Sequence, residues 1–204
     1  FRIALKYMTP VIVLSDGGLA NASEPWKIPD VQQLPDLTPS FHTDPENFSP
    51  YHRNQQTLAC NWAIPGTPGL EHRIGGLEKD SETGEINYEP ENHEKMVLLR
   101  DEKIRRIVRD LPQLKIIGSE KNKLLVVTWG SVFGPAVSAI EELQAEGYSV
   151  SMLHLRHLFP FQENLGEILR KFEKVLVPEM NLGQLSRLLR AEYLVDAISF
   201  SKLQ

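Results

Sequence analysis

The chain has 204 residues, and its 22 Lys and Arg residues against 27 Asp and Glu residues give a formal net charge of −5. This mild acidity argues against a nucleic-acid-binding surface, which needs a basic patch or stripe. The composition, 41% hydrophobic and 24% charged, is that of a folded globular protein rather than a disordered one. No apolar run approaches the roughly 18 residues of a membrane span, so we expect a cytoplasmic protein with no membrane contact.

The chain opens with a short helical pattern. Apolar side chains in residues 1–8 recur at helical spacing, which predicts two helical turns that Thr9-Pro10 then ends. The β-branched run Val11–Leu14 predicts a short buried strand, closed by a turn at residues 15–18. Because one helix and one strand cannot enclose a core, we expect residues 1–22 to end an α/β domain whose body precedes Phe1.

A proline-rich segment follows, with eight of the 14 prolines between Pro25 and Pro68. Proline fixes φ and lacks a backbone donor, so this segment is expected to be extended and irregular. An irregular segment of this length is unusual inside a compact domain, so we expect it to wrap over a neighbouring domain or subunit. Its aromatic residues would anchor it there: Trp26, Phe41, Phe48, Tyr51 and Trp62.

Three turn-rich pieces at residues 66–69, 75–76 and 79–84 allow a hairpin. They lead into a helix predicted from Asn92, as N-cap, to about Leu111. Acid-before-base pairs four residues apart are predicted on it, Asp101 with Arg105 and Glu102 with Arg106. The arginine cluster is either an anion site or a solvated helix face, and the paired acids favour the second.

The last third alternates between apolar strands and amphipathic helices, which predicts an α/β fold with a parallel sheet. Strands are expected at Leu124–Trp129, Val150–Leu155, Val175–Val177 and Val195–Phe200. The helices between them are expected from about Pro135 to Gly147, after an Asn164 cap and after an Asn181 cap, the last with Leu185, Leu188 and Leu189 facing the sheet. The last strand is barely complete at Gln204, so we expect sequence beyond it.

Two turns that join a strand to a helix contain candidate binding groups. Residues 130–134 have glycines where a phosphate could bind a helix N-terminus, but they match neither the P-loop nor GxGxxG, which favours an ordinary tight turn. Residues 178–184 supply Glu179 and Asn181 at the carboxyl edge of the sheet, where open α/β folds bind ligands. Helix capping is the alternative explanation for Asn181.

Other polar residues give weaker signals. His154 and His157 lie three apart near a strand end, but no further Cys or His supplies a zinc site, so ordinary packing is favoured. The glycine-flanked loop with Glu71, His72 and Arg73 is either a surface loop or a contact for an anionic substrate or a partner chain. A lone Cys60 cannot ligate an iron–sulfur cluster, so electrons in any redox system would travel through another chain.

Several long strings carry a family resemblance: KYMTPVIVLSDGGLANASEPWKIPD, PGTPGLEHRIGGLEKD, YEPENHEKMVLLRDEKI, HLRHLFPFQENLGEIL and VLVPEMNLGQLSRLLRAEYLVD. Together they resemble the alpha subunit of 2-oxoacid:ferredoxin oxidoreductases, most closely the 2-oxoglutarate type. The sequence departs from the family pattern at Gly18, where an aromatic is usual, and at Gln162, where a proline is common.

The resemblance implies a fold and a domain division. It implies that residues 1–22 end a thiamine-pyrimidine-binding α/β domain and that residues 23–120 form a connector with a turn-rich segment and one long helix. Residues 121–204 would form a parallel-sheet, transketolase C-terminal-like α/β domain.

The resemblance also implies oxidative decarboxylation of a 2-oxoacid to an acyl-CoA, with electrons passed to ferredoxin and with thiamine diphosphate, Mg²⁺ and a [4Fe–4S] cluster in the whole complex. The diphosphate, metal and cluster sites would lie on a beta subunit, and no catalytic residue maps onto this chain. This portion would associate subunits within an oligomer.

Active-site rim or interface candidates are Asp16, Asn21, Trp26, His72, Arg73, Glu179 and Asn181. Asp16 and Asn21 follow the first predicted strand, at the edge where α/β folds place their sites. The alternative function is a freestanding α/β module that binds CoA or a nucleotide at the carboxyl edge of its sheet.

Overall fold

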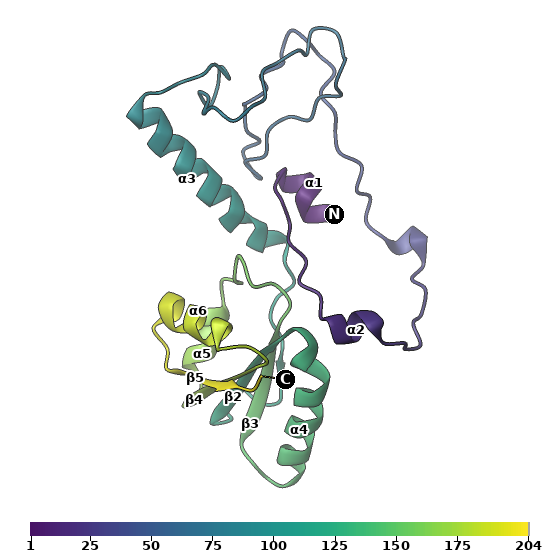
Figure 1. Ribbon diagram of the computed structural model, residues 1–204, viewed down its shortest axis with the longest axis vertical. Helices are drawn as coiled ribbons and strands as arrows, with labels where there is room; N and C mark the ends of the chain where they lie inside the picture. The colour runs from purple at the N-terminus through teal and green to yellow at the C-terminus, as the bar shows by residue number, and fades with distance from the viewer. Residues whose placement is uncertain (204) are drawn as a thin grey trace. The chain divides into compact units, whose positions relative to one another are not determined.

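The computed structural model describes residues 1–203 and divides into two compact units (Figure 1). The first unit comprises residues 1–13 and 26–110. The second unit comprises residues 14–25 together with the chain from residue 111 onward. In the part of the chain that is described, no helix is both long enough and apolar enough to cross a membrane.

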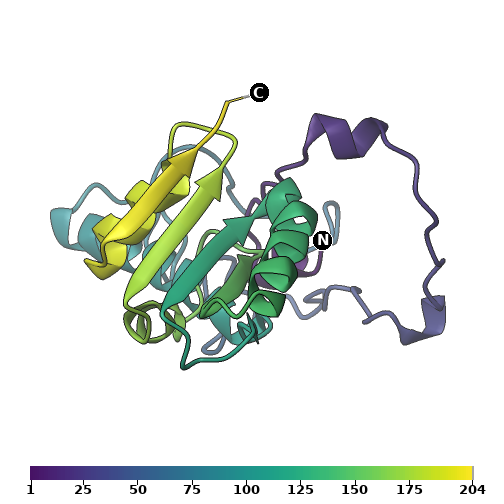
Figure 2. The same cartoon turned by 90° about the horizontal axis from the view of Figure 1, so that it is seen from below.

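The second unit is built on a five-stranded sheet (Figure 2). Its strands lie in the order β1-β3-β2-β4-β5, and all neighbours are parallel except β1, which is antiparallel to β3. The strand bounds are Ile116–Ile117 (β1), Leu124–Trp129 (β2), Val150–Leu155 (β3), Lys174–Glu179 (β4) and Ala197–Ser201 (β5). The predicted α/β fold with a parallel sheet is confirmed, and β2 and β3 have the predicted bounds.

Helices cover both faces of this sheet. They are α4 (Phe133–Ala145, after a 3₁₀ turn at Gly130–Val132), α5 (Leu165–Arg170) and α6 (Gln184–Tyr193). On one face, α5 and α6 bury Leu165, Ile168, Leu169, Leu185 and Leu189 against Leu125, Val127, Val175 and Val177. On the other face, Ile140 of α4 packs with Val126, Val150 and Met152. Successive strand residues point to opposite faces, so β2 supplies both cores.

Two expectations for α6 are wrong. The helix begins at Gln184 with Gly183 as its N-cap, so Asn181 lies before the cap. Leu188 is 52% exposed, whereas Leu185 and Leu189 are buried. The helix packs mainly on β4 and β5 at the edge of the sheet, where one row of its side chains is enough to cover the apolar surface. Leu188 lies outside that row and therefore stays exposed.

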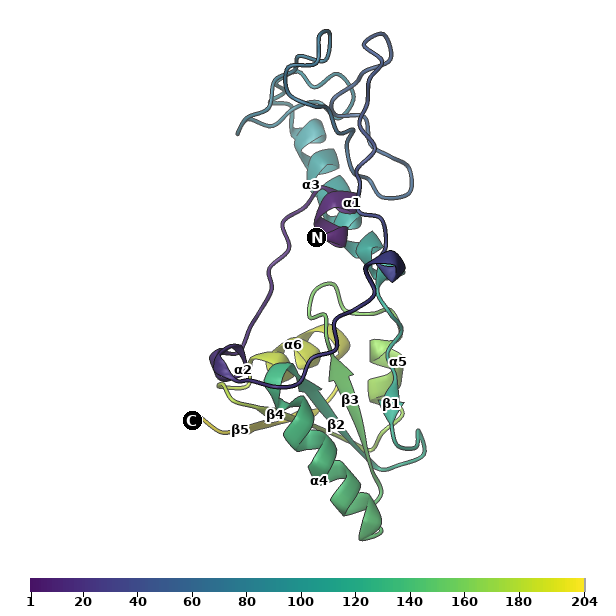
Figure 3. The ribbon, with the colours of Figure 1, turned by 90° about the vertical axis from the view of Figure 1, so that its right-hand side faces the viewer.

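The first unit holds α1 (Arg2–Tyr7) and α3 (Pro90–Arg106), which continues as a 3₁₀ turn at Ile107–Asp110. Figure 3 shows α1 beside the carboxyl end of α3, where the Tyr7 hydroxyl donates to the Arg106 carbonyl at 3.2 Å. The predicted opening helix is thus confirmed. The predicted N-cap of α3 is wrong: the cap is Glu89, because Pro90 is suited to the first helical position, and Asn92 instead donates to the Lys79 carbonyl at 3.1 Å.

The connector is irregular, as predicted, and residues 25–68 contain one 3₁₀ turn at Val31–Gln33 (η1) besides isolated bridges. Of the three turn-rich pieces, the one at residues 79–84 forms a hairpin turn. Lys79 and Ile86 form an antiparallel bridge, and the Asp80 amide donates to the Glu85 carbonyl at 2.8 Å.

The predicted buried strand at Val11–Leu14 is wrong. These residues form no strand, and Ile12 and Val13 are 84% and 83% exposed. The predicted turn that follows is instead the start of α2 (Gly17–Asn21). A strand needs a neighbour to pair its backbone groups, and no strand among residues 1–203 pairs with this run.

Candidate functional site

The carboxyl edge of the sheet has a topological switch point between β2 and β4. The connection from β2 through α4 leads to β3 on one side, and the connection from β3 through α5 leads to β4 on the other side. Pairing of β2 with β4 ends at Val126 and Leu176, so their last residues are not joined by ladder hydrogen bonds. Open α/β sheets bind ligands in this crevice.

In this chain, the buried Glu179 carboxylate bridges the crevice. Its Oε1 accepts hydrogen bonds from Trp129 Nε1 at 3.2 Å and from the Leu185 amide at 2.9 Å, and its Oε2 accepts from the Ser186 amide at 3.1 Å. The first free N–H groups of α6 are therefore satisfied by a side chain of the chain itself. An external anion would have to displace this carboxylate.

Asn181 supports the same arrangement. Its Nδ2 donates to Glu179 Oε1 at 3.0 Å, and its Oδ1 accepts from the amides of Gly183 and Gln184 at 2.8 and 3.0 Å. The structure thus brings Glu179 and Asn181 together, and both side chains satisfy the backbone at the start of α6.

Asp16 holds α2 against the turn that precedes α4. Its Oδ1 accepts from the Gly18 and Leu19 amides at 2.7 and 3.3 Å, and its Oδ2 accepts from the Ser131 hydroxyl at 2.6 Å. The Ser131 hydrogen bond, followed by those from the two amides, lowers the pKa of the Asp16 carboxyl. Asn21 lies on the same short helix and donates to the Gly17 carbonyl at 2.7 Å.

The other three candidates belong to the first unit. Trp26 is 74% exposed. His72 is held by its Nδ1 contact with the Leu70 carbonyl at 2.8 Å and by an edge-on contact with the Phe48 ring. Arg73 is exposed, and its carbonyl accepts from the Tyr51 hydroxyl at 3.2 Å.

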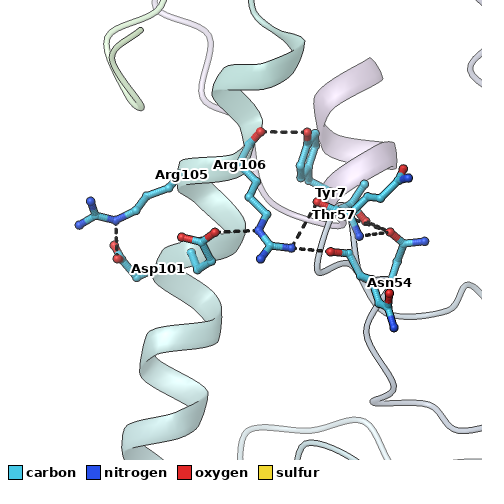
Figure 4. Close-up of polar contacts among 9 residues, drawn as sticks. Tyr7, Asn54, Thr57, Asp101, Arg105 and Arg106 are labelled. Atoms are coloured by element: carbon cyan, nitrogen blue, oxygen red, sulfur yellow. Dashed lines mark hydrogen bonds and ion pairs between the residues drawn. The ribbon is translucent and has the colours of Figure 1, made fainter. Parts of the chain in front are cut away.

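Arg105 and Arg106, in the last turn of α3, have partners within the first unit (Figure 4). Arg106 Nε donates to Glu102 at 2.7 Å, and its Nη1 donates to the Gln55 carbonyl at 2.6 Å. Arg105 Nε donates to Asp101 at 2.6 Å. Both predicted acid–base pairs are confirmed, and Arg106 fastens the loop at residues 54–57 to α3.

A pocket of about 400 Å³ beside the carboxyl end of β3 was missed by the sequence reasoning. We call it the β3 pocket; it is lined by Pro112, Gln113, Leu114, Lys115, Ile117, Phe133, His154, Arg156, His157 and Gln162. Its lining contains basic side chains and no carboxylate. The run His154-Leu155-Arg156-His157 at the end of a predicted strand was the available signal, since strand ends at this edge carry functional groups.

His154 lies at the inner side of the β3 pocket. Its Nδ1 is 2.9 Å from the Thr128 hydroxyl, and its ring centroid is 4.7 Å from that of Phe133. Burial, followed by the charge of Arg156, lowers the pKa of His154. This shift favours the neutral form of the ring, and the lining also contains the cationic side chains of Lys115 and Arg156.

Metal-binding donors do not gather in the described chain. Among residues 1–203, no group of three or more His, Cys, Asp or Glu side chains is placed to hold a metal ion. Cys60 is the single cysteine of the sequence.

Two family models match the chain. Residues 1–91 match "Pyruvate flavodoxin/ferredoxin oxidoreductase, thiamine diP-bdg", and residues 122–197 match "Pyruvate:ferredoxin oxidoreductase core domain II".

Curated relatives match over nearly the whole chain. It is 51% identical to the 2-oxoglutarate oxidoreductase subunit KorA of Mycobacterium tuberculosis, over 100% of this chain and 31% of that protein. It is 31% identical to the 2-oxoacid:ferredoxin oxidoreductase 1 subunit alpha of Aeropyrum pernix, over 94% of this chain and 31% of that protein. The chain therefore spans about a third of the length of these relatives.

A solved structure is also similar. It is the 2-oxoglutarate:ferredoxin oxidoreductase from Magnetococcus marinus with 2-oxoglutarate, coenzyme A and succinyl-CoA bound. The match has a TM-score of 0.92 and 32% identity, and it covers 100% of this chain and 36% of that one.

Proposed function

The chain belongs to the family of 2-oxoacid:ferredoxin oxidoreductase alpha subunits, and from this premise we propose that it forms part of an enzyme that oxidises 2-oxoglutarate. The reaction is oxidative decarboxylation to succinyl-CoA, with the two electrons passed to ferredoxin. The chain contributes an alpha-subunit segment and requires other polypeptide for turnover.

The identity of 51% with the M. tuberculosis subunit, extending over all 204 residues, carries this proposal. The M. marinus structure supports the choice of 2-oxoglutarate and CoA, because it has 2-oxoglutarate, coenzyme A and succinyl-CoA bound.

The cofactors follow from the same premise, and the residues of this chain do not fit two of them. A [4Fe–4S] cluster needs about four thiolates, whereas the chain has only Cys60. Mg²⁺ needs convergent oxygen donors, and no such cluster of acidic side chains is present among residues 1–203. These two groups therefore need other polypeptide, and the family resemblance is our reason for assigning the cluster, Mg²⁺ and the diphosphate of thiamine to a beta subunit. Thiamine diphosphate supplies the carbanion chemistry when bound.

Within the complex, this chain serves association and shaping of the cleft. Residues 1–22 are assigned to the end of a thiamine-pyrimidine domain, residues 23–120 to the connector and residues 121–204 to a transketolase C-terminal-like domain. The exposed apolar residues Ile12, Val13 and Trp26 support contact with further polypeptide, because such side chains gain stability by burial. The partners are the beta subunit within an oligomer, together with CoA and ferredoxin, and the enzyme acts in the cytoplasm.

The test uses the complete alpha subunit that contains this sequence, co-expressed with its beta subunit. Reduction of a viologen dye is measured with thiamine diphosphate, Mg²⁺ and CoA, and with 2-oxoglutarate or pyruvate as substrate. We expect kcat/KM to be at least about tenfold higher for 2-oxoglutarate, a difference of about 1.4 kcal/mol in transition-state free energy. Equal rates would overturn the substrate assignment, and no CoA-dependent turnover with either acid would overturn the proposal. The rival, a freestanding CoA- or nucleotide-binding module, requires saturable CoA binding without a beta subunit.

A further inference from the structure

The β3 pocket concentrates positive charge that the chain does not neutralise. Lys115 and Arg156 both line it, and neither forms an ion pair or a side-chain hydrogen bond with any residue from 1 to 203. Lys171 of the same unit, by contrast, is paired with Glu120 and Glu167 at 3.0 and 3.3 Å. A concave surface with unpaired cations attracts a negative ligand more strongly than a flat one does.

The interior of the pocket adds neutral hydrogen-bonding groups. Gln162 is 6% exposed, and its buried Oε1 has no partner among the described residues. Rotating the amide by 180° exchanges its oxygen and nitrogen, so Gln162 can present N–H donors as well. The Thr128 contact occupies Nδ1 of His154, and Nε2 remains for a ligand. Unpaired buried polar groups are costly, so a ligand that pairs them gains affinity.

From these groups, we propose that the β3 pocket binds a phosphate group, either free phosphate or the phosphate ester of a larger ligand. Arg156 provides a planar guanidinium that binds phosphate oxygens in pairs, and Lys115 provides a second compact charge. A volume of about 400 Å³ exceeds the size of one phosphate and leaves room for part of an attached organic group. The site is separate from Glu179 and the α6 N-terminus, and it does not depend on the oxidoreductase assignment.

The test is calorimetric titration of the 204-residue chain with inorganic phosphate at constant low ionic strength. We expect one saturable site. Its dissociation constant should rise at least about tenfold in Arg156→Gln and severalfold in Lys115→Gln. The dissociation constant of Arg156→Lys should lie between that of Arg156→Gln and that of the unchanged chain. Lys121→Gln is the matched control, because it removes an exposed cation of the same unit outside the pocket, and its affinity should be unchanged. These residues are exposed, so far-ultraviolet circular dichroism should confirm an unchanged fold.

Two further titrations identify the source of the phosphate. If 5′-AMP binds more tightly than inorganic phosphate and adenosine does not bind, the pocket takes a phosphate ester; equal affinities for AMP and phosphate indicate free phosphate. The proposal is overturned if phosphate does not saturate by about 20 mM, if Arg156→Gln binds as well as the unchanged chain, or if adenosine binds as well as AMP.

Discussion

At the scale of single residues, carboxylates of this chain satisfy helix N-termini that would otherwise attract external anions. Glu179 and Asp16 each accept backbone N–H groups of a helix. Glu179 also accepts from the side chains of Trp129 and Asn181, and Asp16 accepts from the hydroxyl of Ser131. A negative group at this position is favoured by the helix dipole and by hydrogen bonds to the free N–H groups. The turn between β4 and α6 is thereby closed from within, and the turn before α4 is tied to α2 through the Ser131 hydroxyl.

This role of Glu179 predicts a cost for removing its charge. Glu179→Gln keeps the size of the side chain but turns an NH₂ group toward N–H donors, leaving a buried donor unpaired. We expect the free energy of unfolding to fall by about 1–3 kcal/mol, as measured by urea denaturation. Glu141→Gln makes the same change on an exposed side chain and serves as the control; it should change the free energy of unfolding by less than about 0.5 kcal/mol. A loss of the same size in both variants would show that the Glu179 hydrogen bonds do not stabilise the fold.

The pKa of Asp16 gives a second prediction at this scale. Because the pKa is lowered in the folded chain, the Asp16 interactions stabilise the fold above the unfolded pKa, and this stabilisation is lost as the pH falls through the folded value. In an NMR titration of the Asp16 carboxyl carbon, the midpoint should lie below the ordinary value of 3.8.

The variant Ser131→Ala should move that midpoint upward, since the Ser131 hydroxyl is the main cause of the shift. Ser119→Ala, on an exposed serine elsewhere in the same unit, serves as the control and should leave the midpoint unchanged. An Asp16 midpoint unaffected by Ser131→Ala would contradict the hydrogen bond.

At the scale of helices and strands, the elements that were predicted correctly are those whose own residues show a hydrophobic pattern typical of a strand or a helix. β2 and β3 are continuous apolar runs bounded by polar or glycine residues, and α5 repeats apolar residues at helical spacing, so local pattern and buried face agree. Val11–Leu14 has the same β-branched pattern but no strand to pair with in the described chain. The residue pattern of a segment shows that it is suited to a strand, but whether it forms one depends on a second strand with which it can pair.

The contrast between α5 and α6 yields a matched prediction. Leu169→Ala should lower the free energy of unfolding by about 2–5 kcal/mol, because the side chain is 1% exposed within the core between α5 and the sheet. Leu188→Ala makes the same chemical change at a position that is 52% exposed, and we expect a loss below about 1 kcal/mol. Urea denaturation measures both, and equal losses would contradict the assigned faces of the helices.

The β3 pocket shows why a site is harder to predict than the strands around it. Lys115 reaches the pocket because β1, only two residues long, pairs antiparallel with β3 through Ile116 and Leu153. Two residues carry no measurable periodicity, so the sequence does not indicate this pairing. The sequence does place His154 and Arg156 at a strand end, but the cation opposite them depends on a tertiary contact.

At the scale of the whole molecule, the composition of the chain limits what it can do alone. It holds one cysteine and, among residues 1–203, no metal-binding cluster. We therefore expect the 204-residue chain to show no viologen reduction with 2-oxoglutarate, CoA, thiamine diphosphate and Mg²⁺. The co-expressed complex is the positive control, and turnover by the chain above the protein-free blank would contradict the assignment of the cofactor sites to other polypeptide.

The connector gives the last prediction. Trp26 is 74% exposed, and a tryptophan that becomes buried in an interface removes a large apolar area from water. If the connector wraps over other polypeptide of the complex, Trp26→Ala in the complete alpha subunit should weaken its association with the beta subunit by about tenfold or more. Arg73→Ala, on the loop that contains His72, tests the same interface through a charged residue. Association is measured by analytical ultracentrifugation across a dilution series.

The stability of the chain itself separates this effect from misfolding. Since Trp26 makes little contact within the first unit, its removal should change the free energy of unfolding of the 204-residue chain by less than about 0.5 kcal/mol. Tyr88→Ala removes another exposed aromatic side chain of the same unit, 79% exposed and outside the segment at residues 25–68, and should leave association unchanged. Normal assembly together with unchanged kcat/KM in both Trp26→Ala and Arg73→Ala would mean that the connector packs only on its own chain, because an interface that buries these side chains cannot lose them without a change in affinity.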